Sequence, residues 1–443
     1  MKDQLYKKMK PLFHLIEHEY QKISPLELLL IQLARGNTYN TRIVGLEAVK
    51  KFREENPDCS ITFKPNHLSE ADFILLNLAF RENGMKVVTE GGSNLFIDNI
   101  DIFRDLLPAY VNPQFSQTRI NNSMTIAEYL STRGAFKVIR EPGKIMQKDG
   151  RTIKVGNKEI LSLSRAYRYH LLKEKEMYVT FPGYSVIKNG MFNNSGNDLV
   201  KTGRSYTGRT DGFHHLPFQM DIEASYYTGV ELYLVDVNIA YEPVMEDMNF
   251  IELIKSAQAG TDQDEIYKKD LGYIIKEFCR NQNSGNLSIK FGEPYKVNTS
   301  IFKEDILNIK IKKYAKKLAE ETFEKTLAMQ PVFPANIYFS AFNDSFNRIS
   351  VNTMKERIDD LRDYIRKATY GIYKRKPDLY YLLDYKNSII TADEIINRTF
   401  MKFNTERRQI TGMDGDMFIV YRKDVAMQYK NHTKHFFESI NFI

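Results

Sequence analysis

The residues best placed to do chemistry are His67 and Asp72, which lie five positions apart in the segment 66–72. A histidine changes charge near neutral pH, so it can take a proton from a hydroxyl group at physiological pH. A carboxylate bonded to the second ring nitrogen would select the tautomer and stabilise the imidazolium that forms. The pair therefore predicts a general base that activates an alcohol oxygen.

The spacing of this pair constrains the local structure. Five positions correspond to about 140° of rotation in a regular helix, so the two side chains cannot share one helical face. They can meet only if His67 lies in the turn and Asp72 lies in the first turn of the apolar helix that follows. Ser69 is a good N-cap for that helix. The alternative is a simple capping pair, Ser69 with Asp72, which carries no chemistry.

Two further segments could bind a phosphate group through arginine, whose planar and permanently charged fork suits that ligand. Residues 134–140 read GAFKVIR, so Arg140 ends a predicted strand at an edge where sheets commonly hold ligands. Residues 203–209 read GRSYTGR, a composition that suits a loop around an anion. A surface arginine on an ordinary strand and a flexible basic loop are the structural alternatives.

Taken in order, these segments resemble the boxes of the glycerophospholipid acyltransferase family. Residues 66–72 look like its NHxxxxD box, and residues 134–140 are similar to its GxxxxxR box. Residues 203–208 resemble the end of its EGGRSRTG box, and the alternating strand 235–242 resembles its VPVxIxYE box. Outside the boxes, residues 91–96, 290–294 and 427–436 look like its AGxNL, xFGEP and YYxNxIxHxF elements. The resemblance runs from about residue 60 to 438.

The resemblance implies transfer of a fatty acyl group from acyl-CoA or acyl carrier protein to the hydroxyl of glycerol-3-phosphate in phospholipid synthesis. His67 would be the general base and Asp72 its orienting partner. The acceptor phosphate would be bound by Arg140 and Arg204, in a loop shaped by Gly203 and Ser205. No cofactor is implied beyond the thioester co-substrate. The alternatives are lysophosphatidic acid as the acceptor, or a lipid-binding protein that keeps the fold without turnover.

The third box departs from the family pattern. The family carries a glutamate after an apolar strand, whereas Gly183 follows Phe181-Pro182 here, and the position three residues before Arg204 is Lys201. Residues 184–202 look like a polar loop inserted inside that box, and residues 108–133 look like a second insertion. The role of the family's glutamate therefore has no residue to carry it.

Strands alternating with helices predict an α/β fold, a mixed sheet flanked by helices as in the glycerolipid acyltransferases, with helical extensions at both ends. Strands are expected at 60–64, 86–89, 135–139, 177–181, 231–241 and 287–291, and helices at 70–82, 125–132, 159–175 and 264–279. Loops are expected at 148–158 and 184–202. We expect a helical segment at 1–50, the α/β domain at 51–300 and a mostly helical extension at 301–443.

Charge and composition point to an anionic surface as a partner. Residues 301–443 hold 25 Lys+Arg against 19 Asp+Glu, a net charge of +6, whereas the whole chain has a net charge of +7. The sequence contains no run of eighteen apolar residues, so we predict no membrane-spanning helix. We also expect no signal peptide. The two cysteines, Cys59 and Cys279, suit a reducing compartment. We expect a cytoplasmic protein held peripherally on the inner face of a membrane, with the basic, tyrosine-rich run 364–376 as a contact face.

Other motifs are weaker. His14, Glu17 and His18 form an HxxEH pattern, whose histidines share a helical face as zinc would need. It has no recognisable third ligand, so we predict no metal. His214-His215 is expected to pack in a loop. The basic C-terminal third carries no aromatic platform motif for RNA, and we predict no nucleic-acid partner.

Overall fold

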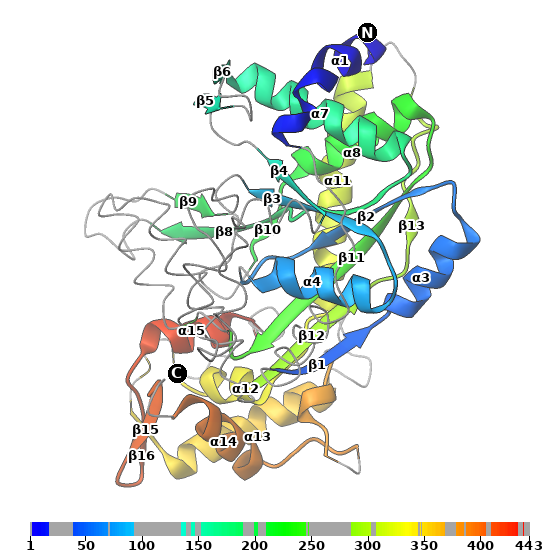
Figure 1. Ribbon diagram of the computed structural model, residues 1–443. Helices are drawn as coiled ribbons and strands as arrows, with labels where there is room; N and C mark the ends of the chain where they lie inside the picture. The colour runs from blue at the N-terminus through cyan, green and yellow to red at the C-terminus, as the bar shows by residue number, and fades with distance from the viewer. Residues whose placement is uncertain are drawn as a thin grey trace, which may run out of the picture.

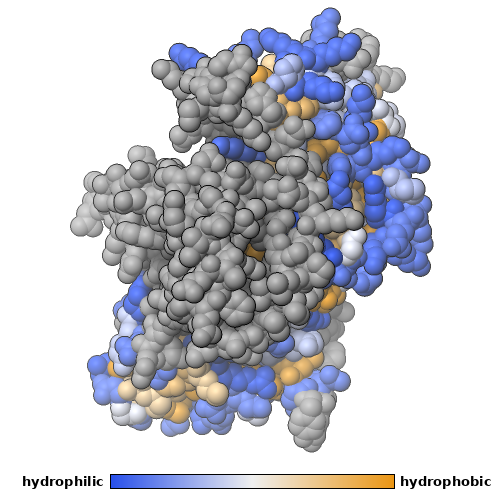
Figure 2. Space-filling view, viewed as in Figure 1, coloured by the Kyte–Doolittle hydropathy of each residue, from blue (hydrophilic) through white to orange (hydrophobic). Residues whose placement is uncertain are grey.

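The computed structural model describes residues 2–16, 39–69, 71–92, 134–138, 143–146, 152–188, 199–202, 210–244, 247, 285–302, 307–343, 346, 348–367, 378–384, 387–404, 409–432 and 437. A large sheet lies at the centre of the ribbon, with helices on both faces and a separate helical layer beside it (Figure 1). Hydrophilic residues cover most of the described surface around α1 and α3 (Figure 2).

The central sheet has eight strands in the order β1-β12-β11-β2-β7-β3-β4, with β13 paired to β11. Neighbours from β11 to β4 run parallel, whereas β12 and β13 are antiparallel to β11. The strands are β1 (Tyr39–Val44), β2 (Ser60–Pro65), β3 (Val87–Gly92), β4 (Ala135–Val138), β7 (Met177–Val179), β11 (Leu232–Glu242), β12 (Gly285–Phe291) and β13 (Tyr295–Lys296). The predicted α/β fold with a mixed sheet is confirmed.

Each face of the sheet has its own hydrophobic core. One core packs the sheet against α3 (Leu46–Glu55) and α4 (Ala71–Glu82). The other packs it against α1 (Lys2–Met9), the 3₁₀ helix η1 (Lys10–Leu15), α7 (Asn157–Lys173), α8 (His215–Thr228) and α11 (Leu307–Ala328). Because side chains alternate along a strand, Val237, Ile239 and Tyr241 of β11 enter the first core, while Asn238 faces α11.

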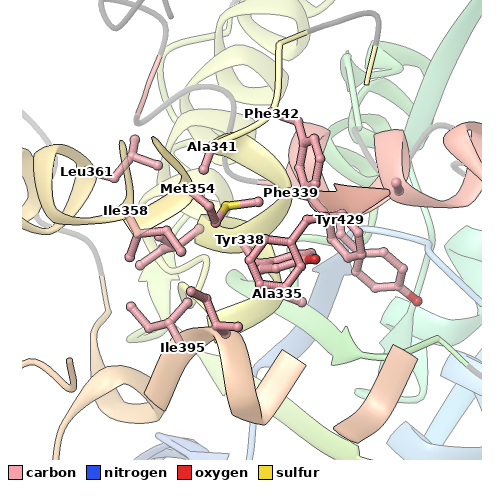
Figure 3. Packing of buried hydrophobic residues seen from close by; sticks show 14 of the residues in the cluster. Ala335, Tyr338, Phe339, Ala341, Phe342, Met354, Ile358, Leu361, Ile395 and Tyr429 are labelled. Atoms are coloured by element: carbon pink, nitrogen blue, oxygen red, sulfur yellow. The ribbon is translucent and has the colours of Figure 1, made fainter. Parts of the chain in front are cut away.

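The C-terminal layer has a third core (Figure 3). It is built from α12 (Pro334–Ser340), α13 (Val351–Lys367), η8 (Tyr380–Leu382), α14 (Ala392–Phe403), α15 (Lys423–His432) and the small antiparallel sheet of β14 (Ile349–Ser350), β15 (Thr411–Asp414) and β16 (Met417–Val420). Glu242 at the end of β11 anchors this layer: its carboxylate accepts from the Ala335 backbone N–H at 2.8 Å and pairs with Lys402 at 2.6 Å.

Several elements differ from the sequence-based predictions. The expected loop 184–202 contains an antiparallel hairpin of β8 (Gly183–Lys188) and β9 (Leu199–Thr202), and β10 (Gly212–Phe213) joins it. The expected loop 148–158 contains β6 (Thr152–Val155), paired with β5 (Gly143–Met146), and the start of α7. Polar composition concealed short β-branched runs that pair with each other rather than with the main sheet.

Two further differences are a helix that was not expected and a strand within an expected helical segment. His215 does not pack in a loop, because it is the first residue of α8, which the sequence reading missed. The expected helical segment 1–50 includes the edge strand β1, which pairs with β12. The expected helices at 125–132 and 264–279 lie outside the described residues. The division at residues 50 and 300 stays a prediction.

Candidate functional site

The turn that follows β2 is held rigidly against β11. The Asn66 side chain donates from Nδ2 to the Ile239 carbonyl at 2.9 Å and accepts from the Ile239 N–H at 2.7 Å. Asn66 is 4% exposed, so these two bonds are made away from water. Its amide thus pairs with the strand as another backbone would, which sets the position of the next residue, His67.

His67 and Asp72 meet as the spacing requires. Nδ1 of His67 lies 2.9 Å from Oδ2 of Asp72. The same oxygen accepts the backbone N–H groups of Leu68 at 2.7 Å and Ser69 at 3.0 Å, while Ser69 Oγ accepts the Ala71 N–H at 3.0 Å. One carboxylate therefore caps the start of the helix and also binds the imidazole, which is the geometry that the capping and the catalytic interpretation each require.

A third residue completes this group, and sequence reasoning missed it. The Tyr241 hydroxyl donates to Oδ1 of Asp72 at 2.5 Å. The Asp72 side chain is 0% exposed, so a buried carboxylate receives its stabilisation entirely from these donors. Tyr241 lies in the strand that resembles the last family box, and its alternation toward the α4 face was the only signal in the sequence that could have indicated it.

The geometry leaves one ring nitrogen of His67 available. With Nδ1–H donated to Asp72, Nε2 keeps its lone pair and can accept a proton; this tautomer is assigned from the hydrogen-bond partners. The His67 side chain is 19% exposed, and its ring lies 4.9 Å from that of Phe181, centroid to centroid. A partly exposed, oriented imidazole at the carboxyl end of a parallel strand is the arrangement expected of a general base.

The third-box position lies beside this turn. A Cβ added to Gly183 would lie 3.4 Å from Thr210 Cγ2 and 3.7 Å from the His67 backbone nitrogen. The strand β8 thus passes directly against the residue that bears the imidazole, although it brings no carboxylate there. Lys201, the other position examined for the missing glutamate, lies in β9.

The four predicted phosphate-binding residues Arg140, Gly203, Arg204 and Ser205 lie outside the described residues. The structure does describe the strands that precede them, β4 and β9. β4 ends at Val138 and runs parallel to β3 and, through β7, to β2, so its carboxyl end lies at the same edge of the sheet as His67. β9 ends at Thr202, directly before Gly203. Their roles in phosphate binding stay predictions.

A buried ionic cluster lies on the other face of β2. Lys64 Nζ pairs with Asp221 Oδ2 at 2.5 Å, and Arg168 bonds Asp221 Oδ1 at 2.9 Å and also pairs with Glu90. Burial lowers the pKa of Lys64 to about 8, against the opposing effect of Asp221. These ion pairs join β2, β3, α7 and α8 to one another beneath the site.

Metal binding finds no support among the ranges that the structure describes, where no three His, Cys, Asp or Glu side chains come together as a metal site would need. Glu17 and His18 of the HxxEH pattern lie outside those ranges. The prediction concerning this motif therefore stays as the sequence left it.

Comparison with known proteins finds similarity among solved structures. No protein-family model matches the chain, and no curated protein matches it. Among solved structures, it is similar to the 1-acyl-sn-glycerophosphate (LPA) acyltransferase PlsC from Thermotoga maritima. The two chains are 14% identical, the match covers 68% of this chain and 79% of that chain, and the TM-score is 0.28. This similarity assigns no function to the chain, whose own residues must indicate it.

Proposed function

We propose that this protein is an acyltransferase that moves a fatty acyl group from a thioester to the hydroxyl of glycerol-3-phosphate. The observation that carries the proposal is the 2.9 Å contact between His67 Nδ1 and Asp72 Oδ2, in which a fully buried carboxylate orients a partly exposed imidazole. The ordered sequence boxes that contain this pair support the choice of acyl transfer over other uses of a histidine base.

The reaction follows from that geometry. Nε2 of His67 takes the proton of the acceptor hydroxyl as its oxygen bonds to the thioester carbonyl carbon. Asp72 stabilises the imidazolium that results. The tetrahedral intermediate collapses with cleavage of the C–S bond, and the imidazolium returns the proton to the departing sulfur. The products are an ester and a free thiol, and His67 is restored.

Acceptor binding is assigned to the two arginine-bearing segments. Arg140 and Arg204 would hold the phosphate while Gly203 and Ser205 shape the loop, which brings the reacting hydroxyl within reach of His67. The sequence forms at 134–140 and 203–208 favour glycerol-3-phosphate over lysophosphatidic acid. Acyl-CoA and acyl carrier protein are both possible donors, since each presents the same thioester.

The second proposal is a lipid-binding protein without turnover, which Gly183 at the third-box position supports. An assay of ester formation decides between the two proposals. Purified protein is incubated with acyl-CoA or acyl carrier protein as donor and with either acceptor, and the ester is detected by mass spectrometry. We expect ester from glycerol-3-phosphate and none from a His67→Ala variant. Lipid binding without ester from any pair of substrates would establish the binding protein instead.

We also propose contact with an anionic membrane surface, because the product of the reaction is amphipathic. No helix in the described part of the chain has the length and apolarity needed to cross a bilayer. The first half of α11 carries five lysines and no acidic residue over 307–319, namely Lys310, Lys312, Lys313, Lys316 and Lys317. All five are exposed, and Ile309 among them is 73% exposed.

This basic half of α11 fits the chemistry of such a membrane. Lysines attract anionic headgroups, and an isoleucine between them can enter the headgroup layer. A second exposed side chain, Ile301 at 52%, precedes Phe302, whose ring lies 5.7 Å from that of Tyr314 in the same half of the helix. The run 364–376, of which residues 368–376 lie outside the described part, remains the contact face predicted from the sequence.

A further inference from the structure

A narrow cavity lies directly behind the turn that bears His67. Both neighbours of the histidine, Asn66 and Leu68, line it, although His67 does not. The remaining walls come from Thr210, from β10, β11 and α15, and from α11 with the residues that directly follow it. Their polar contributors are Thr210, Asn238, Thr326, Gln330 and His432.

Four of the residues that line the cavity each carry a buried polar atom with no hydrogen-bond partner among the residues that the structure describes. These atoms are Asn238 Oδ1, Thr326 Oγ1, Gln330 Nε2 and His432 Nδ1. Their residues are 1%, 1%, 5% and 5% exposed, respectively. Buried polar groups in proteins are almost always paired, and each one left alone costs about 1–3 kcal/mol. Four such atoms around one cavity therefore indicate a site that a ligand completes.

The orientation of the two amides is set by their other ends. Asn238 donates from Nδ2 to Gln330 Oε1 at 2.9 Å and to the Thr326 carbonyl at 3.1 Å. Asn238 Oδ1, an acceptor, and Gln330 Nε2, a donor, are thus the side-chain atoms left without a partner. The Thr326 hydroxyl can act in either sense.

The helix that brings His432 is firmly anchored. Tyr429, one turn earlier in α15, packs in the C-terminal core (Figure 3). Its hydroxyl accepts the Val244 N–H at 3.0 Å and donates to Asp247 at 2.5 Å, and its carbonyl accepts from Asn336 Nδ2 at 2.8 Å. The position of His432 is therefore fixed by contacts of α15 that do not involve the cavity.

The cavity is suited to an uncharged group. Among the described residues, none that line it is an Asp, Glu, Lys or Arg. Burial lowers the pKa of His432 to about 4, which leaves that ring neutral at physiological pH. An ion would lose its hydration there without a countercharge. A hydroxyl group both donates and accepts, as the four atoms around the cavity require.

We propose that this cavity is a subsite for a neutral hydroxyl group of the acceptor, the one that is not acylated. The inference rests on the proposed function for the identity of the acceptor. It assigns Asn238, Thr326, Gln330 and His432 to substrate recognition, and it makes the C-terminal layer part of the acceptor site. The phosphate would stay with the arginine-bearing segments, and the neutral hydroxyl would enter beside Asn66 and Leu68.

Two acceptors that differ by a single hydroxyl test the proposal. Glycerol-3-phosphate and 3-hydroxypropyl phosphate share the phosphate and the terminal hydroxyl, and only the first has the middle hydroxyl. We expect the protein to prefer glycerol-3-phosphate by at least about 100-fold in kcat/KM, because the analogue leaves buried polar groups unpaired. Thr326→Val, which removes the hydroxyl at nearly constant volume, and Gln330→Leu should each reduce that preference by about 10-fold or more.

The matched control is Gln428→Leu, a change of the same kind at a buried glutamine of α15 that does not line the cavity. It should leave the preference unchanged. A subsite filled by water alone would make the cavity variants lose activity equally with both acceptors, and this result would overturn the proposal.

A binding measurement separates this failure from failure of the catalytic proposal. Calorimetric titration of the His67→Ala protein with each phosphate compares their dissociation constants without any turnover. A larger dissociation constant for 3-hydroxypropyl phosphate than for glycerol-3-phosphate supports the subsite even if no ester forms, provided that Thr326→Val abolishes this difference. Equal affinities for the two compounds, or no binding of either, would overturn it.

Discussion

The Tyr241 hydroxyl donates a hydrogen bond to the Asp72 carboxylate across 169 positions of sequence. This bond links β11, at the centre of the sheet, to the first turn of the helix that follows the turn bearing His67. The carboxylate that orients His67 is thereby held from two sides, by backbone N–H groups of its own turn and by a phenol from another strand. The orientation of the base is consequently a property of the sheet as well as of the turn.

Replacing this phenol should weaken catalysis without weakening substrate binding. Tyr241→Phe removes one hydrogen bond to a charged group, which is worth about 1.5–3 kcal/mol. We expect kcat to fall by about 10- to 100-fold, with the acceptor KM unchanged. Steady-state kinetics over both substrates measures the two constants separately.

The control for that variant is Tyr39→Phe. The Tyr39 ring lies 5.6 Å from that of Tyr241, and its hydroxyl donates to the Pro243 carbonyl at 2.9 Å rather than to Asp72. Thermal unfolding should reveal a loss of stability in both variants, smaller in Tyr39→Phe because its acceptor is uncharged, while kcat stays normal in Tyr39→Phe. Equal kcat values for the two variants would show that Tyr241 acts only on stability.

His67→Ala should reduce turnover by at least about 100-fold, since that is the usual contribution of a general base. The fold should be preserved, because Asn66 and the Asp72 carboxylate keep their backbone partners. The measurement is ester formation per minute by protein whose circular dichroism matches that of the unmodified chain. Residual activity within threefold of the starting value is incompatible with the proposed base.

Arg204→Ala should act mainly on the acceptor, because its proposed partner is the phosphate. We expect the KM for glycerol-3-phosphate to rise by about 10- to 100-fold, as loss of a charged hydrogen bond implies, with the KM for acyl-CoA unaffected. Arg204→Lys keeps the charge without the planar fork and should lie between the two. A change confined to kcat removes the phosphate-holding role.

Asp236 should make stability depend on pH in the opposite sense to most carboxylates. Burial raises its pKa from 3.8 to about 7, against the lowering effects of Lys325 and Tyr295. Between these two pH values the folded chain holds a proton that the unfolded chain has released, so this group makes stability fall as pH rises from about 4 to 7. Asp236→Asn, which keeps an acceptor for the Tyr295 hydroxyl, should be more stable than the original by a few kcal/mol, about 1–4, at pH 8.

Urea unfolding at pH 4 and pH 8 measures this effect, and the gain should vanish at the lower pH. Asp378→Asn is the contrasting variant. Although burial opposes its ionisation, the hydrogen bond and charge of Lys290 lower the pKa of Asp378. That variant should lose stability at pH 8. A stability difference for Asp236→Asn that is the same at both pH values contradicts the assignment.

Binding to lipid vesicles tests the basic half of α11. Each lysine near an anionic surface contributes about 1 kcal/mol, so changing Lys312, Lys313 and Lys316 to Gln should weaken binding to phosphatidylglycerol-containing vesicles by about 100-fold. The unmodified chain should bind neutral vesicles poorly, and its affinity should fall with salt. Co-sedimentation at two salt concentrations gives both quantities.

The control removes the same charge elsewhere, by changing Lys51, Lys86 and Lys296, which pair with glutamates, to Gln. It should bind vesicles normally. A variant with Arg366 and Lys367 changed to Gln tests the face predicted from the sequence. Loss of binding in that variant, with normal binding in the α11 variant, moves the membrane contact to α13.

Local sequence was sufficient to predict that the pair His67 and Asp72, called here the dyad, lies in contact. His67 and Asp72 are brought together by a strand end, a turn and a helix start within one short segment, and the bonds that close the turn come from its own backbone. The parallel strands and α4 were equally predictable, because buried strands and helices show in a continuous apolar pattern. The hairpin β8–β9 was not, since its two short β-branched strands lie in a polar stretch and, among the described strands, pair with each other and with β10 rather than with the main sheet.

Tertiary structure alone decided what surrounds the dyad. Tyr241 reaches Asp72 because β11 pairs with β2 in one particular register, in which Val237 lies opposite Pro65. Asn238, Gln330 and His432 line one cavity because β11, the end of α11 with the residues after it, and α15 pack together although they are far apart in the sequence. Turn and capping bonds are made between near neighbours, whereas these contacts depend on the summed packing of three cores, which no short segment of the chain encodes.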